Sequence, residues 1–99
     1  MAVEKLSEGQ LKAALEDLSN WELKDEKLHR ELKFKNFVQA WGFMTQVAME
    51  AEKADHHPEW CNVYSRVTID LTTHEADGIS QKDVALAKKI DQIAATLLG

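Results

Sequence analysis

Two adjacent histidines before a proline form the part of this sequence best suited to proton transfer. His56 and His57 precede Pro58, the only proline, and Glu52 and Asp55 supply carboxylates nearby. A free imidazole has a pKa near ~6.5, so it can give and take protons near neutral pH. Proline cannot continue a helix, and it favours an extended conformation in the residue before it. We therefore expect the pair where a helix ends, at the negative end of its dipole.

The spacing of Glu52 and His56 suggests how one ring is oriented. The two residues are four apart, so they share a face of a continuous helix. We expect this carboxylate to pair with His56, to orient its ring and to favour its protonated form. His74, further along the chain, is a third candidate for proton transfer.

A zinc site built from the three histidines is an alternative, because three histidines with an open position form a common catalytic centre. Neighbouring side chains such as those of His56 and His57 diverge, however. The sequence also lacks the i, i+4 histidine pair that is typical of helical metal sites. We therefore expect no metal.

Each candidate residue also has a purely structural explanation. A histidine pair before a proline is by itself more often a solvated helix end than an active site. Asp83 stands at the third position of a helix that begins near Ser80, where it acts as a cap. The tryptophans are most simply core aromatics: Trp21, Trp41 and Trp60.

Composition limits the classes of function. The chain has 99 residues and a net charge of -5, with 17 acidic and 12 basic residues. An acidic chain is a poor direct ligand for nucleic acid. Cys61 is the only cysteine, which rules out an intrachain disulfide. No apolar run reaches the ~20 residues of a membrane span, and the start does not resemble a signal peptide. We expect one domain over 1–99, located in the cytoplasm.

Periodicity predicts three helices and four strands. Apolar residues at helical spacing predict helices over 8–18, from Asn36 to the histidine pair, and from Ser80 onward. Capping patterns open each of them, as in Ser7-Glu8-Gly9-Gln10. Alternating residues predict one hairpin around 24–27 and another from Trp60 to about 72. The predicted fold is α+β, with the order α-β-β-α-β-β-α and a four-stranded antiparallel sheet that carries three helices on one face.

The long helix has an unusually broad apolar stripe. A surface helix needs a stripe of only ~100°, whereas this one covers about 160° at 100° per residue. We expect it to be covered twice, by its own sheet and by another chain. A broad core stripe in a compact monomer is the alternative. The stripe consists of Phe37, Ala40, Trp41, Phe43, Met44, Val47, Ala48, Ala51 and Ala54.

The spacing of the candidate residues resembles the signature of the pterin-4a-carbinolamine dehydratase family, also known as 4a-hydroxytetrahydrobiopterin dehydratases. It runs Glu52-x3-His56-His57-Pro58-x5-Tyr64-x9-His74-x8-Asp83. Flanking segments such as Trp41-Gly42-Phe43-Met44 are also similar, and the resemblance covers nearly the whole chain. The sequence departs from the family pattern in small ways: Cys61 stands where an aromatic is expected in animal members, and Lys82 stands where arginine is common.

The resemblance implies a hydro-lyase that converts 4a-hydroxytetrahydropterin into quinonoid dihydropterin and water, without a cofactor, in tetrahydrobiopterin recycling. It implies that His56 and His74 are the acid/base pair, that His57 mainly binds substrate, and that Glu52 supports the site. The substrate-binding residues that it implies are Asp55, His56, His57, Pro58, Thr72, Thr73, His74, Glu75, Trp21 and Asp83.

The resemblance also implies partners other than the pterin. Members of the family form homotetramers, as a dimer of dimers. Animal members also act as dimerisation cofactors of a homeodomain transcription factor, through the long-helix surface that otherwise builds the tetramer. The alternative function is therefore that of a coactivator, with a nuclear as well as a cytoplasmic location. No direct contact with nucleic acid or membrane is expected.

Overall fold

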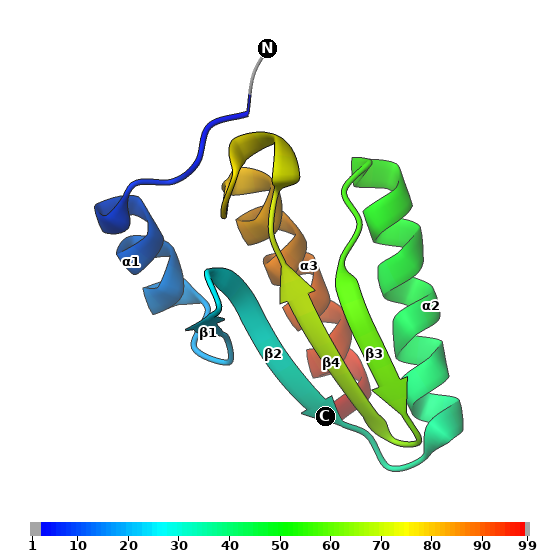
Figure 1. Cartoon of the computed structure of the whole chain (residues 1–99). Helices are drawn as coiled ribbons and strands as arrows, with labels where there is room; N and C mark the ends of the chain where they lie inside the picture. The colour runs from blue at the N-terminus through cyan, green and yellow to red at the C-terminus, as the bar shows by residue number, and fades with distance from the viewer. Residues whose placement is uncertain (1–2, 99) are drawn as a thin grey trace.

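A computed structural model describes residues 3–98 of the chain. The order of elements is α-β-β-α-β-β-α, and a 3-10 turn, η1, follows the last strand. The strands form one antiparallel sheet in the order β1-β2-β4-β3 (Figure 1). The predicted α+β class and order are confirmed. The elements are α1 (Glu8–Asp17), β1 (Glu22–Lys24), β2 (Lys27–Lys33), α2 (Phe37–Ala54), β3 (Glu59–Val63), β4 (Arg66–Leu71), η1 (His74–Ala76) and α3 (Gln81–Leu98).

Side-chain caps fix the helix starts as the sequence predicted. The Ser7 hydroxyl accepts a hydrogen bond from the backbone N–H of Gln10, and the Gln10 side chain accepts one from the backbone N–H of Ser7. At α2 the Asn36 side chain accepts from the N–H of Gln39. Each cap satisfies a backbone donor that would otherwise lack an intrahelical partner.

One face of the sheet and the helices enclose the core. In β4 the inward positions are apolar and alternate with outward polar ones, as a half-exposed strand requires. In β2 the inward residues Leu28 and Leu32 flank Arg30, which pairs with Asp91 of α3. α2 and α3 run side by side; in Figure 1 α3 passes behind the sheet, α2 lies beside β3, and α1 lies beside β1. The Phe34 and Phe43 rings meet at 4.8 Å between their centroids. Other core side chains include Leu18, Leu28, Leu32, Val47, Ile69, Leu71, Val84 and Ile90.

The opposite face of the sheet is charged. Glu22, His29, Asp70 and Glu59 stand directly opposite one another across the four strands. Although His29 lies on this polar face, it is buried, with Nδ1 2.8 Å from Asp70 Oδ1 and Nε2 3.2 Å from Glu31 Oε2. The hydrogen bond with Asp70 raises the pKa of His29 above its usual value, against the opposing effect of burial.

The broad stripe of α2 is only partly covered within this chain. Phe43 and Val47 are buried, as is the rest of the sheet-facing half. Trp41 was predicted to be a core aromatic, and this is wrong, because 58% of its surface is exposed. Phe37 is also exposed, and their rings lie 6.2 Å apart. Trp21, by contrast, is buried as predicted.

None of the helices within residues 3–98 is both long enough and apolar enough to cross a membrane.

Candidate functional site

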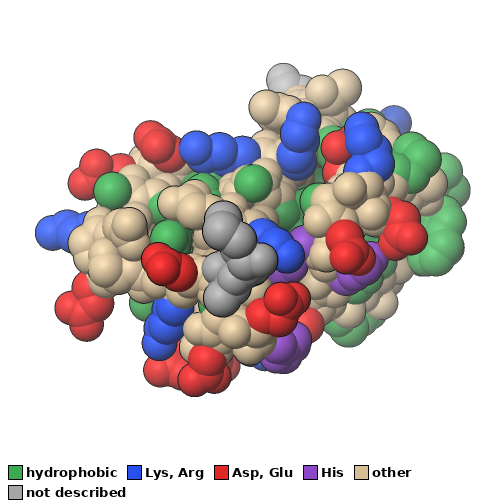
Figure 2. All heavy atoms as spheres, turned by 90° about the horizontal axis from the view of Figure 1, so that it is seen from above, with side chains coloured by type: hydrophobic (Ala, Val, Ile, Leu, Met, Phe, Trp, Pro, Cys, Tyr) green, Lys and Arg blue, Asp and Glu red, His purple; other side chains and the backbone are tan. Residues whose placement is uncertain are grey.

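The three candidate histidines lie at one end of the molecule. His56 and His57 follow the C-terminus of α2, and His74 begins η1, just after β4 ends. Both segments are at the top of Figure 1, close to the start of α3. Figure 2 looks down on this end and shows histidine side chains among acidic ones. Residues far apart in the sequence are thus brought to the same end of the sheet.

The turn after α2 determines where the two adjacent rings point. Asp55 adopts the left-handed conformation, with a φ of 51°, and its N–H closes the last turn of the helix. The helix therefore ends at Ala54, before His56. Pro58 favours an extended conformation at His57, and the rings of His56 and His57 have different partners.

His56 bonds to Asp83 in α3, with 2.6 Å between Nε2 and Oδ1. Its side chain is 10% exposed, and the Asp83 side chain is fully buried. The predicted pair of Glu52 with His56 is therefore wrong. That expectation needed the helix to continue through position 56, but the backbone turns at Asp55.

Glu52 instead accepts a hydrogen bond from the other ring. Its Oε1 lies 2.9 Å from Nε2 of His57. The pair is exposed, at 57% for His57 and 81% for Glu52. Exposed ion pairs contribute only ~0–1 kcal/mol, so His57 is loosely held and open to solvent.

His74 is exposed to solvent at the end of the sheet. Its side chain is 84% exposed, and Nε2 is 3.5 Å from Oε2 of Glu59, the first residue of β3. The other oxygen of Glu59 lies 2.6 Å from Nζ of Lys27, a contact that raises the pKa of that lysine. Sequence reasoning missed Glu59, because its link to His74 depends on β3 and β4 being neighbours.

A buried hydrogen-bond network connects the His56 side of the site to the segment that carries His74. Oδ2 of Asp83 accepts bonds from the Thr73 hydroxyl at 2.7 Å and from the Ser80 backbone N–H at 2.9 Å. The Thr73 and Ser80 hydroxyls are 2.7 Å apart. Thr73 directly precedes His74, so Asp83 binds both His56 and the residue next to the third histidine.

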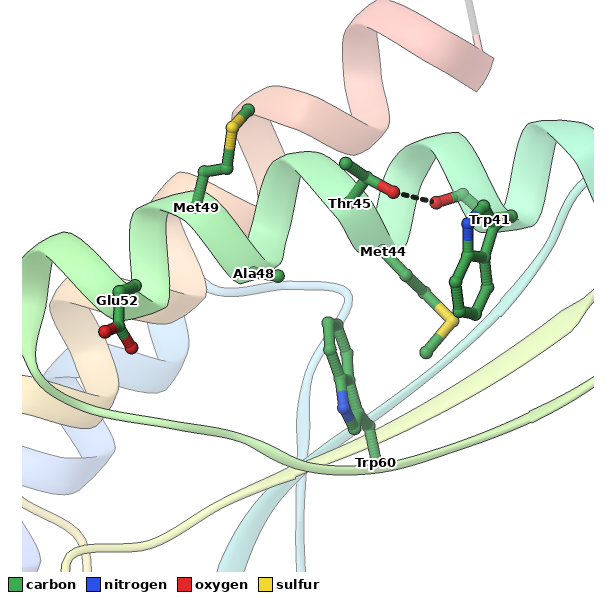
Figure 3. Close-up of a pocket in the computed structure, with 7 residues that line it drawn as sticks. All are labelled: Trp41, Met44, Thr45, Ala48, Met49, Glu52 and Trp60. Atoms are coloured by element: carbon green, nitrogen blue, oxygen red, sulfur yellow. Dashed lines mark hydrogen bonds between the residues drawn. The ribbon is translucent and has the colours of Figure 1, made fainter.

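Pockets lie on three sides of this end. His56 borders one of about 390 Å³ between α2 and α3, together with Lys53 and Lys82. His74 borders one of about 140 Å³ beside the β1–β2 turn. Glu52 stands at the end of a groove of about 560 Å³ in which Trp60 points from β3 toward α2 (Figure 3). In one chain these pockets are separate, and each holds one of the predicted catalytic side chains.

The other predicted site residues take varied positions. Thr72 is half-buried and shares the pocket of His74, while Glu75 is exposed in η1. Pro58 is half-buried after the histidine pair. Trp21 does not share a pocket with any of the three candidate histidines. Its indole N–H donates to Asp91 in α3 at 2.7 Å, and it lines a different pocket with His29 and Arg30.

The arrangement suits acid/base chemistry. Each of the three imidazoles has a carboxylate partner: Asp83 for His56, Glu52 for His57 and Glu59 for His74. A carboxylate orients an imidazole ring by accepting a hydrogen bond from one of its nitrogens. Within residues 3–98, no group of three His, Cys, Asp or Glu side chains is arranged to hold a metal ion.

Comparisons with known proteins agree on one family. The model of the family described as pterin 4 alpha carbinolamine dehydratase matches residues 4–93. A protein of Solibacter usitatus, whose name assigns it provisionally to these dehydratases, is 56% identical over 92% of this chain and 96% of its own length. One of Prochlorococcus marinus, named in the same way, is 50% identical over 92% and 95%. A crystal structure from Brucella melitensis, described as a transcriptional coactivator/pterin dehydratase, superposes with a TM-score of 0.89 at 44% identity, over 92% of this chain and 99% of that one.

Proposed function

Because the chain belongs to the pterin-4a-carbinolamine dehydratase family, we propose that it dehydrates 4a-hydroxytetrahydropterin to quinonoid dihydropterin and water. The observation that carries the proposal is the buried link from His56 through Asp83 to Thr73, the residue before His74. It holds one imidazole firmly and ties it to the segment that carries another. Cytoplasmic recycling of tetrahydrobiopterin is part of this proposal.

The reaction needs two proton transfers. The C4a–O bond breaks, and a proton delivered to that oxygen lets it leave as water, since hydroxide is a poor leaving group. The ring nitrogen N5 gives up its proton, and its electrons form the new N5–C4a double bond. His56 and His74 are the proposed acid/base pair, and each such group is worth ~10²–10⁴-fold in rate. His57, exposed and weakly paired, is the proposed substrate-binding histidine.

The test is turnover of the 4a-carbinolamine by alanine variants. His56→Ala and His74→Ala should each lower kcat by about 10²-fold or more, since each removes a proton carrier. His57→Ala should chiefly raise KM. His29→Gln is the matched control, because it removes a histidine outside this end of the molecule and should leave kcat unchanged. If His56→Ala and His74→Ala both kept the wild-type kcat, the assignment of these histidines as the acid/base pair would be wrong.

The exposed face of α2 favours a second role in association. Trp41 and Met49 are each 58% exposed beside the groove of Figure 3, and apolar side chains grouped on one exposed face are a feature of interaction sites. We propose that this face binds further copies of the chain, as a dimer of dimers. Binding of a homeodomain transcription factor through the same face is the alternative, and the description of the Brucella melitensis protein as a coactivator supports it.

A further inference from the structure

Ser80 has no proposed part in the reaction, yet its hydroxyl belongs to the buried network behind His56. The Ser80 and Asp83 side chains are fully buried, and Thr73 is 2% exposed. The hydroxyl of Ser80 is 2.7 Å from that of Thr73, which in turn is 2.7 Å from Oδ2 of Asp83. Buried polar groups are costly unless they are satisfied, so the direction of each hydrogen bond can be worked out.

The network has one consistent set of donors. The backbone N–H of Ser80 can only donate, and it does so to Oδ2 of Asp83. The Thr73 hydroxyl donates its single proton to the same oxygen. Thr73 must therefore accept from the Ser80 hydroxyl, whose oxygen accepts in turn from the backbone N–H of Lys82 at 3.2 Å. Two donors thus converge on Oδ2.

This donor order determines the proton at the other oxygen of Asp83. Two donors on Oδ2 are the pattern of a carboxylate that only accepts hydrogen bonds, so Oδ1 is an acceptor too. The atom 2.6 Å from it is Nε2 of His56, which must then carry the proton. Within residues 3–98, Nδ1 of His56 makes no hydrogen bond, and it is the nitrogen left to exchange a proton.

We propose that Thr73 and Ser80 are positioning residues that keep Asp83 an acceptor, so that neutral His56 is the Nε2–H tautomer and reacts through Nδ1. The role in catalysis rests on the proposed dehydratase function, whereas the tautomer does not. Asp83 and Thr73 then act through His56 and not by touching substrate, which agrees with their burial. The backbone N–H and carbonyl of Thr73 are also bonded internally, to Gly78 and Ala76.

Two measurements test the proposal. Nitrogen NMR of protein labelled with 15N-histidine, at a pH where the rings are neutral, should show His56 with its proton on Nε2; the His56→Gln variant assigns the signal. Thr73→Val should lower kcat about 10-fold or more through misplacement of the ring, and it should mix the two tautomers. Thr73→Ser, which keeps the hydroxyl, should retain wild-type kcat and tautomer. Thr96→Val, an exposed helical position, is the matched control.

A proton on Nδ1 in the wild-type protein would overturn the proposal, whether or not the protein is a dehydratase. The proposal would also be overturned if Thr73→Val kept both the kcat and the His56 tautomer of the wild type. If Thr73→Val fails to fold, Ser80→Ala replaces it, with Ser80→Thr as the hydroxyl-retaining partner. If the tautomer is as proposed and the wild-type protein does not turn over the carbinolamine, only the dehydratase function fails.

Discussion

Replacing Asp70 by asparagine should destabilise the protein in acid and hardly change it in alkali. Asp70 is the main partner of the buried His29, and their hydrogen bond is the largest cause of the raised pKa of that histidine. The substitution keeps the size of the side chain and removes its charge. The amide oxygen at position 70 could still accept a hydrogen bond from the ring, but Glu31, which is 67% exposed, would be the only carboxylate left in contact with it.

The direction of the pKa shift of His29 determines at which pH the protein is stabilised. In the unfolded chain the pKa of His29 is near its ordinary value of ~6.5. In the folded protein it is higher, so the ring binds its proton more tightly when folded. The resulting stabilisation is complete below about pH 6.5 and is lost as the pH rises through the folded pKa. Asp70→Asn should therefore matter most on the acid side of this window.

The structure limits the size of the effect. A hydrogen bond to a charged group contributes about 1.5–3 kcal/mol. The ring is only 5% exposed, which limits screening by solvent, but its burial opposes protonation. The exposed contact with Glu31 adds no more than ~1 kcal/mol. We expect a loss of about 1–2 kcal/mol near pH 6, or roughly 4–16 °C in Tm for a chain of this size.

Urea denaturation, followed by circular dichroism at a series of pH values, measures this loss. Glu16→Gln removes one negative charge from an exposed position of α1 and serves as the matched control, with a flat difference across the series. If the unfolding free energies of wild type and Asp70→Asn run parallel from about pH 6 to pH 9, the assignment of the stabilisation to protonated His29 is refuted.

Two further predictions concern the core and the α2 face. Phe43→Ala should lower the free energy of unfolding by about 3–5 kcal/mol in urea denaturation, because the ring is fully buried against Phe34; a loss below ~1 kcal/mol would contradict this packing. Sedimentation equilibrium at micromolar concentration should give a mass several times the 11.2 kDa of one chain, reduced by Trp41→Glu. A monomeric wild-type protein would remove the interface assigned to α2.

Local sequence patterns predicted the elements well, because their causes are local. The capping side chains of Ser7 and Asn36 bond within three residues, and each helix begins where these patterns place it. The second hairpin begins one residue before its predicted start at Trp60. Its first strand ends before Tyr64, because that residue takes a left-handed turn conformation with a φ of 52°.

The contacts of the site were harder to predict, because most of them join distant residues. His56 and Asp83 are 27 positions apart, and they meet only once α2 and α3 pack together. His29 is buried against Asp70, 41 positions away, on a face that its alternation marks as polar. The predicted pair of Glu52 with His56 was wrong for a different reason: the spacing of the two residues does not reveal that the helix ends before Asp55.

The left-handed residue at the end of α2, Asp55, fixes the directions of the two histidine side chains that follow it. Because the chain reverses at Asp55, one imidazole is directed inward to α3 and the next is directed back along α2. Inserting a single residue between Asp55 and His56 would shift both rings by one position and take His56 away from Asp83, although every side chain of the motif would still be present. The partner of each ring therefore depends on its position after Asp55, and not only on the presence of two histidines.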